Sequence, residues 1–114
     1  MNQTLELSPA QMRELGYRVV DLIAEHFSRS GDEPVGRKGD PAVLRPAWLG
    51  PPPLAPVEPS EIFARLERDV FPNTLNIAHP RFFAFVPGPS NFVSVMADAL
   101  AAGFNVFNGS WLGG

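Results

Sequence analysis

The chain has 114 residues, enough for one domain at most, and carries twelve Asp and Glu residues against nine Lys and Arg residues. It has no basic run, which argues against nucleic acid as a partner. It has no cysteine, which excludes disulfides, thiolate catalysis and zinc-thiolate sites and is compatible with a cytoplasmic location. The longest apolar stretch, residues 95–107, carries Asp98 and Asn105 and is too short and too polar to cross a membrane. The N-terminus has no apolar signal segment, so we expect no secretory leader and no membrane partner.

Proline is the unusual feature of the composition. The chain has 13 prolines and 10 glycines, which prevent long stretches from forming either helix or central strand. Hydrophobic residues still make up 45% of the chain, too many for a disordered one. We therefore expect apolar segments that bury themselves against something other than this chain.

The first predicted helix begins after Ser8. Ser8 can act as the N-cap, Pro9 suits the first helical position, and Gln11 completes a capping box. The helix is expected to end near residues 28–31. Within this helix, apolar residues at steps of three and four form one stripe: Met12, Leu15, Val19, Leu22, Ile23 and Phe27.

Residues 31–59 show no periodicity and are interrupted by prolines, including Pro51-Pro52-Pro53. This pattern predicts an extended, polyproline-like connector, which we call the strap. Four apolar residues suggest that the strap is held against a surface: Val43, Leu44, Trp48 and Leu49.

A second helix is expected to be capped by Ser60 and to end at Phe71-Pro72. Its apolar stripe is Ile62, Phe63, Leu66 and Val70. A short aromatic, proline-containing segment, residues 77–90, is expected to be extended. Ser90 or Asn91 can then cap a third helix, whose buried side is expected to carry Phe92, Val95, Met96, Ala99 and Leu100.

Three stretches, taken together and in order, carry a resemblance to a known family. They are "MRELGYRVVDLIAEHF", "VLRPAWLGPPPLAPVEPSEIFARLERDVFP", and "HPRFFAFVPGPSNFVSVMADAL" followed by "GSW". The chain resembles the N-terminal segment of the group II pyridoxal-phosphate-dependent decarboxylases, which include aromatic-L-amino-acid, histidine, tyrosine and glutamate decarboxylases. The resemblance covers nearly the whole chain.

The resemblance implies a mainly α fold of three helices with a long Pro-rich extended connector, the truncated N-terminal dimer-clamp segment of a type I PLP-dependent (aminotransferase-like) fold. Residues 1–89 would form the clamp, and residues 90–114 would begin the large PLP-binding domain, which would continue beyond Gly114. The implied cofactor is pyridoxal 5'-phosphate, held by a lysine outside this chain. The implied partners are the second subunit of a homodimer, the C-terminal remainder, and a small amino-acid substrate.

The resemblance also implies a substrate-binding role for six residues. Phe85, Val86, Pro87 and Gly88 match a loop that lines the substrate side-chain pocket, and Phe107 and Gly109 match positions at the pocket edge contributed across the dimer. An apolar, aromatic wall suits an aromatic ring. The alternative for Phe85, Pro87 and Gly88 is ordinary packing, as we expect for Phe82 and Phe83. Relatives often carry hydroxyl groups at positions 85 and 88. Their absence here leaves the substrate side chain open. The sequence also does not distinguish decarboxylation from the oxidative deamination that some relatives perform.

No residue of the chain is predicted to be catalytic or to bind the cofactor or a metal. His79 has no Ser, Asp or Glu near it in sequence, and His26 lies beside an apolar stripe. Lys38 is flanked by Arg37 and Gly39 in the strap and reads as a solvated charge rather than a Schiff-base lysine. The segment alone is therefore expected to be inactive. The competing interpretation is a non-catalytic helical interaction module, or the relic of a truncated gene.

Overall fold

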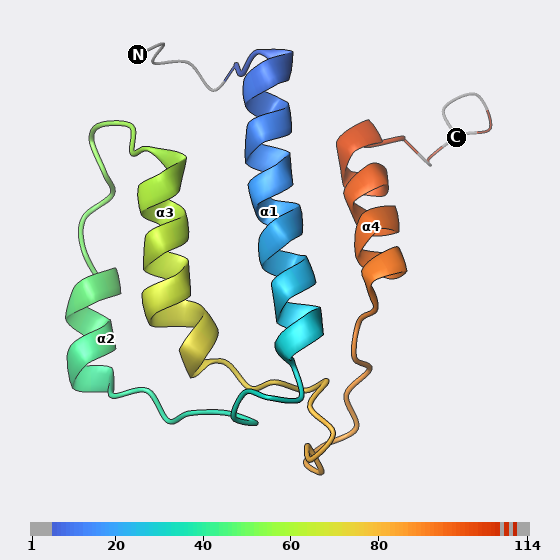
Figure 1. Cartoon of the computed structure of the whole chain (residues 1–114). Helices are drawn as coiled ribbons and strands as arrows, with labels where there is room; N and C mark the ends of the chain where they lie inside the picture. Colours follow the sequence, from blue (N-terminus) through green and yellow to red (C-terminus); the bar gives the residue numbers. More distant parts are fainter. Residues whose placement is uncertain (1–5, 108, 110, 112–114) are drawn as a thin grey trace. The chain divides into compact units, whose positions relative to one another are not determined.

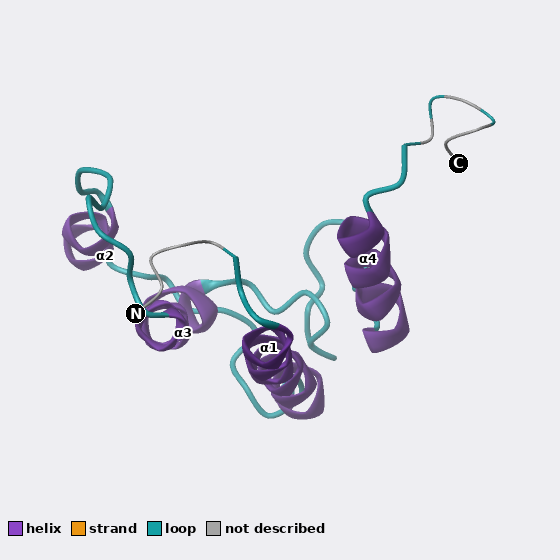
Figure 2. Ribbon diagram, turned by 90° about the horizontal axis from the view of Figure 1, so that it is seen from above, coloured by secondary structure: helices purple, strands orange, loops and turns teal. Residues whose placement is uncertain are grey.

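The computed structural model describes residues 6–107, 109 and 111, and these residues form helices and connecting segments without a strand (Figures 1 and 2). The mainly helical prediction is confirmed. The chain divides into two compact units, one ending at Phe83 and one beginning at Ala84. The predicted domain boundary between residues 89 and 90 stays a prediction. The elements in chain order are α1 (Pro9–Arg29), α2 (Pro41–Trp48), α3 (Pro59–Arg65), the π-helical turn η1 (Leu66–Val70), the 3-10 turn η2 (Phe71–Asn73) and α4 (Phe92–Phe104).

Helix α1 begins and ends where the sequence predicts. The Ser8 hydroxyl accepts a hydrogen bond from the Gln11 amide, and the Gln11 side chain accepts one from the Ser8 amide at 2.9 Å, which completes the capping box. His26 and Arg29 lie in the last turn, where positive charge favours the helix dipole. The apolar stripe is present, but none of the residues of α1 is buried.

Helix α2 corrects the prediction of an unbroken extended strap. Asp40 caps it by accepting a hydrogen bond from the Ala42 amide at 2.8 Å, and Pro41 occupies the first helical turn. Pro46 lies inside the helix, which ends two residues later at Trp48. The Asp-Pro pair was the readable signal for this helix. The density of prolines obscured it, because Pro opposes helix in the interior but favours it in the first turn.

The second predicted helix is present but begins and ends differently. Pro59, with its fixed φ, takes the first helical turn of α3, so the N-cap is Glu58 and the prediction of Ser60 as the cap was wrong. The α-helical part ends at Arg65, and the chain continues through the wider η1 and the tighter η2. Pro72 has no amide hydrogen and cannot continue an α-helical ladder.

Helix α2 is held against α3 by one arginine. The Arg65 guanidinium donates to the Ala47 carbonyl at 2.8 Å and lies over the Trp48 ring at 4.5 Å from its centroid. Such a cation–π contact stabilises an exposed site by roughly 0.5–1 kcal/mol. Trp48 was expected to hold the strap against a surface. The structure shows that its ring packs against the guanidinium of Arg65.

The end of α1, the strap and the segment after η2 meet in what we call the polar joint: Ser30, Val35, Asn76 and His79. Ser30, Asn76 and His79 are the buried polar residues of the described chain, at 9%, 8% and 5% exposure. The Asn76 side chain donates to the Ser30 carbonyl at 2.9 Å and its oxygen accepts from the Ser30 hydroxyl at 3.1 Å. The Asn76 amide donates to the Val35 carbonyl at 2.7 Å. A methyl group at the neighbouring Gly36 would meet the Leu75 side chain at 2.6 Å, so the strap passes close to this segment.

The second unit is built on α4. Asn91 caps it, accepting from the Ser94 amide at 3.0 Å while the Ser94 hydroxyl accepts from the Asn91 amide at 3.3 Å. This confirms Asn91, of the two predicted candidates, as the cap. Asn105 closes the helix in the left-handed conformation. The face expected to be buried is not: Val95 and Met96 are half-buried, and Phe92, Ala99 and Leu100 are exposed.

Apolar burial is incomplete in the described part of the chain. None of its hydrophobic side chains is buried, although hydrophobic residues make up 45% of the sequence. A folded domain normally gains most of its stability from such burial. No helix among the described residues is long and apolar enough to span a membrane.

Candidate functional site

Phe85, Val86, Pro87 and Gly88 lie in the non-helical segment that leads into α4, with a bend at Phe85. The Phe85 ring is 84% exposed and Val86 is fully exposed, so the core alternative for Phe85 is not realised within this chain. Phe85 has a φ of 61°, a left-handed conformation that bulky L-residues rarely adopt. Such strain is concentrated at ligand-binding and catalytic sites in proteins, where the surrounding structure maintains it.

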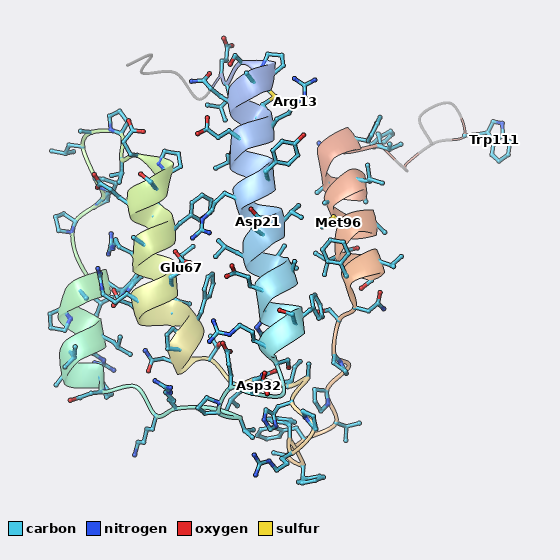
Figure 3. All side chains as sticks on the ribbon, viewed as in Figure 1. Arg13, Asp21, Asp32, Glu67, Met96 and Trp111 are labelled. Carbon is cyan, nitrogen blue, oxygen red and sulfur yellow. The ribbon has the colours of Figure 1, made fainter. Side chains whose placement is uncertain are left out.

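Phe107 and Gly109 follow α4 at its other end. Phe107 is 69% exposed, and its ring lies where a Cβ atom on Gly109 would stand, with ring atoms 2.7–2.8 Å from that position. Only glycine leaves room for this contact unless the ring moves. Phe107 and Gly109 thus form one local pair. Trp111 is also exposed and is labelled in Figure 3, as is Met96 on α4.

The structure does not bring the six predicted residues together. The segment Phe85–Gly88 precedes the N-terminus of α4, and Phe107 and Gly109 follow its C-terminus. Helix α4 has 13 residues and is therefore about 20 Å long at 1.5 Å per residue. One copy of this segment alone presents two separate apolar groups, one at each end of a helix.

No acid–base pair or metal cluster accompanies these residues. The described chain has no group of three or more His, Asp or Glu side chains that could hold a metal ion. His79 is buried and bonded to backbone: its Nδ1 accepts from the Arg81 amide at 2.9 Å. The Arg68 guanidinium donates to the Asp69 carboxylate at 2.8 Å and lowers the pKa of that carboxyl group, which is a local effect within η1.

The residues of this chain do not fit a pyridoxal-phosphate site. Lys38 is the only lysine in the sequence and is exposed in the strap, whereas a Schiff-base lysine requires a desolvated pocket that lowers its pKa. A segment of this kind can supply apolar walls and packing surfaces, but not the covalent chemistry of the cofactor.

The polar joint was missed by sequence reasoning. No catalytic role was expected for His79, and the partners of its side chain were not foreseen. The signal that existed was local: a short acceptor side chain before Pro-Arg can accept from the amide two residues on, as in an Asx-turn. The 46-residue separation between Ser30 and Asn76 carries no sequence signal of this kind.

The chain is similar in sequence and in fold to known proteins. No protein-family model matches the chain. An aromatic-L-amino-acid decarboxylase of Bacillus atrophaeus is 43% identical over 114 residues, which is all of this chain and 24% of that protein. In sequence and in fold, this chain matches the N-terminal segment of the group II decarboxylases.

Two solved structures support the match in fold. Tryptophan decarboxylase of Catharanthus roseus, in complex with L-tryptophan, superposes with a TM-score of 0.84 at 24% identity, covering 96% of this chain and 24% of that one. The Oryza sativa enzyme TDC with PLP and tryptamine also gives 0.84, at 23% identity, covering 96% of this chain and 23% of that one. The chain thus spans about a quarter of the length of the proteins that it matches.

Proposed function

We propose that this chain is the N-terminal part of a pyridoxal-phosphate-dependent carboxy-lyase that acts on an aromatic L-amino acid. In this proposal it contributes dimer interface and a wall of the substrate pocket, and is inactive alone. The observation that carries the proposal is the 43% identity over the full chain to an aromatic-L-amino-acid decarboxylase. The cofactor would be bound by the remaining three quarters of the polypeptide, where it supplies the electron sink for loss of the carboxylate.

The exposure of apolar side chains supports an interface role. Helices α1 and α4 have well-formed N-caps and apolar faces, yet none of their described residues is buried. Exposed apolar area on this scale marks a surface that binds other protein. The most economical partners are the rest of the same polypeptide and the second subunit of a homodimer, because most soluble oligomers are symmetric homodimers.

The separation of the six candidate residues supports a pocket shared between subunits. Phe85–Gly88 and the Phe107–Gly109 pair lie at opposite ends of α4. Because the length of the helix separates the two groups, those of a single copy cannot both contact one ligand ring. A two-fold axis would allow the Phe85–Gly88 segment of one subunit to meet the Phe107–Gly109 pair of the other. The apolar character of both groups favours an aromatic substrate side chain.

We also propose a cytoplasmic location, which agrees with the absence of cysteine from the sequence. The alternative of a free-standing interaction module predicts a folded, cooperatively melting chain. The described part of this chain has no fully buried hydrophobic side chain to support such a transition. This favours the interpretation as a segment of an enzyme over the interpretation as an independent module.

The coding DNA beyond codon 114 gives the first test. We expect the reading frame to continue for several hundred codons and to encode a lysine in a large domain. The full-length product, loaded with pyridoxal phosphate, should release carbon dioxide from aromatic L-amino acids, with L-glutamate as the control substrate. The 114-residue chain should release none. A stop directly after codon 114, or preference for L-glutamate, would contradict the proposal.

A further inference from the structure

Two of the polar contacts between helix α1 and the rest of its unit differ greatly in character. One is the ion pair between Arg18 and Glu67 at 2.7 Å, with side chains 42% and 39% exposed (Glu67 is labelled in Figure 3). Exposed pairs of this kind contribute little to stability and are screened by salt. The other is the polar joint at the C-terminal end of the helix. The apolar stripe of α1 is only partly covered within the chain, with Leu22, Ile23 and Phe27 half-buried, so the buried hydrogen bonds of the joint are the directional contacts of this helix.

The joint is held by hydrogen bonds that water cannot easily replace. Asn76 bonds the Ser30 carbonyl, the Ser30 hydroxyl and the Val35 carbonyl, and its own carbonyl accepts from the His79 amide at 3.1 Å. Because Ser30 and Asn76 are buried, removing one partner leaves the other without compensation from solvent. The Asn76 side chain therefore joins the end of α1 to the segment after η2, while the Asn76 backbone amide joins the same segment to the strap.

His79 completes the joint through one side of its ring. Its Nδ1 accepts from the Arg81 amide at 2.9 Å and its carbonyl accepts from the Phe82 amide at 2.9 Å, which closes the turn around Pro80. An accepting Nδ1 requires the neutral tautomer with the proton on Nε2. Nε2 is buried and has no hydrogen-bond partner among the described residues. The ring therefore acts in the turn through Nδ1, a position that an asparagine oxygen can occupy.

We propose that Asn76 and His79 are positioning residues for the dimer clamp, so that the polar joint fixes the direction of α1 and thereby presents its apolar stripe to a second copy of the full-length chain. This inference rests on the proposed function, because it takes α1 to be part of a subunit interface. Two polar residues of the joint would then control the strength of dimerisation.

The test uses the full-length holoenzyme and measures the dimer dissociation constant by sedimentation at a temperature well below unfolding. Asn76→Ala should raise the dissociation constant at least about tenfold, equivalent to about 1.4 kcal/mol. At protein concentrations that keep the dimer intact, kcat and KM should be unchanged. Ser30→Ala removes only the hydroxyl bond and should give a smaller increase of the same kind.

A matched pair at position 79 makes the test specific. Asn and Leu are similar in size, but only Asn can accept from the Arg81 amide. His79→Leu should weaken dimerisation about tenfold, whereas His79→Asn should stay within about twofold of the parent. If Asn76→Ala fails to fold, this pair decides the question. Equal dissociation constants for the two variants would overturn the role of His79. If His79 has a purely structural role, His79→Leu should lower the melting temperature and leave the dimer dissociation constant unchanged.

A variant of the apolar stripe separates this inference from the proposed function. Leu22→Ala should weaken the dimer if α1 is at the interface. If Leu22→Ala weakens it but Asn76→Ala and His79→Leu do not, the joint inference is wrong and the clamp stands. If none of the three changes dimerisation, the interface role of α1 in the proposed function is wrong.

Discussion

The polar joint and the apolar helix faces are stabilised in opposite ways. In the joint, Ser30, Asn76 and His79 are buried and connected by hydrogen bonds within the chain. On α1 and α4, apolar side chains are present at helical spacing, yet none is buried. A self-sufficient domain normally shows the reverse, with apolar groups inside and polar groups at the surface.

This difference separates two tasks within one segment. Hydrogen bonds are directional, so a few buried ones can fix the course of a chain without a large core. Apolar burial is non-directional and scales with area, so it suits contact with a large partner surface. We therefore expect changes on the apolar side to alter association, and changes to caps and polar contacts to alter local structure.

The largest effect should come from the apolar stripe that runs through α3 and η1. Leu66 is half-buried, and Leu66→Ala should destabilise the full-length dimer by about 1–3 kcal/mol because apolar area is lost. Phe63→Ala should behave similarly, and Glu61→Gln, exposed on the same helix, is the control. Sedimentation over a dilution series measures the effect. A normal dimer at low concentration would count against the clamp.

A smaller and purely local effect is expected at the cap of α2. Asp40→Ala removes the hydrogen bond to the Ala42 amide and should cost about 1 kcal/mol in stability of α2. Hydrogen exchange of the amides in residues 42–48 should accelerate, while Asp40→Asn, which keeps an acceptor, should preserve their protection. Dimerisation should be unaffected. A weakened dimer would show that α2 also belongs to the interface.

At the candidate pocket, the effect should appear in substrate binding alone. Phe85→Ala in the full-length enzyme removes an aromatic contact worth about 0.5–1.5 kcal/mol, so KM for an aromatic substrate should rise roughly two- to tenfold. Cofactor absorbance should remain normal. Phe82→Ala serves as a comparison at a packing position. Loss of the cofactor in the Phe85 variant would mean that the residue supports the cofactor domain instead.

The smallest effect is expected from the pair Arg68 and Asp69. Hydrogen bonding from Arg68 lowers the pKa of the Asp69 carboxyl group below its value in the unfolded chain, about 3.9. Its stabilising effect is therefore complete above that pH and is lost as pH falls through the lower folded pKa. The stability of the parent and of Asp69→Asn, measured by thermal unfolding with circular dichroism, should differ slightly at pH 6 and converge at low pH. A difference that grows on acidification would contradict this sign.

Local signals in the sequence predicted the ends of some helices and failed at others. The boxes at Ser8 with Gln11 and at Asn91 were readable because each cap bonds within three residues. Helix α2 was missed because the many prolines of residues 31–59 indicated an extended connector, although Pro41 follows an Asp cap. The start of α3 was misplaced by two residues because Ser60 was preferred over the residue before Pro59.

The candidate substrate residues were identified by resemblance, since their exposed apolar character could not have distinguished them from packing residues. Their location at the two ends of α4 follows from the length of the helix, of which the sequence predicted the N-terminal cap. The left-handed backbone of Phe85 could not be anticipated, because nothing in its side chain favours a positive φ.

The sequence by itself determined the capped helices, the apolar stripes and the likeness to the decarboxylases, because these depend on residues within a few positions of each other or on their order along the chain. Only the tertiary structure decided that Ser30 meets Asn76, that Arg65 covers Trp48, and that the stripes are only partly covered within the described residues. The physical reason is that contacts between distant segments depend on chain direction in space. Here a few buried hydrogen bonds contribute to that direction, and no hydrophobic side chain among the described residues is fully buried.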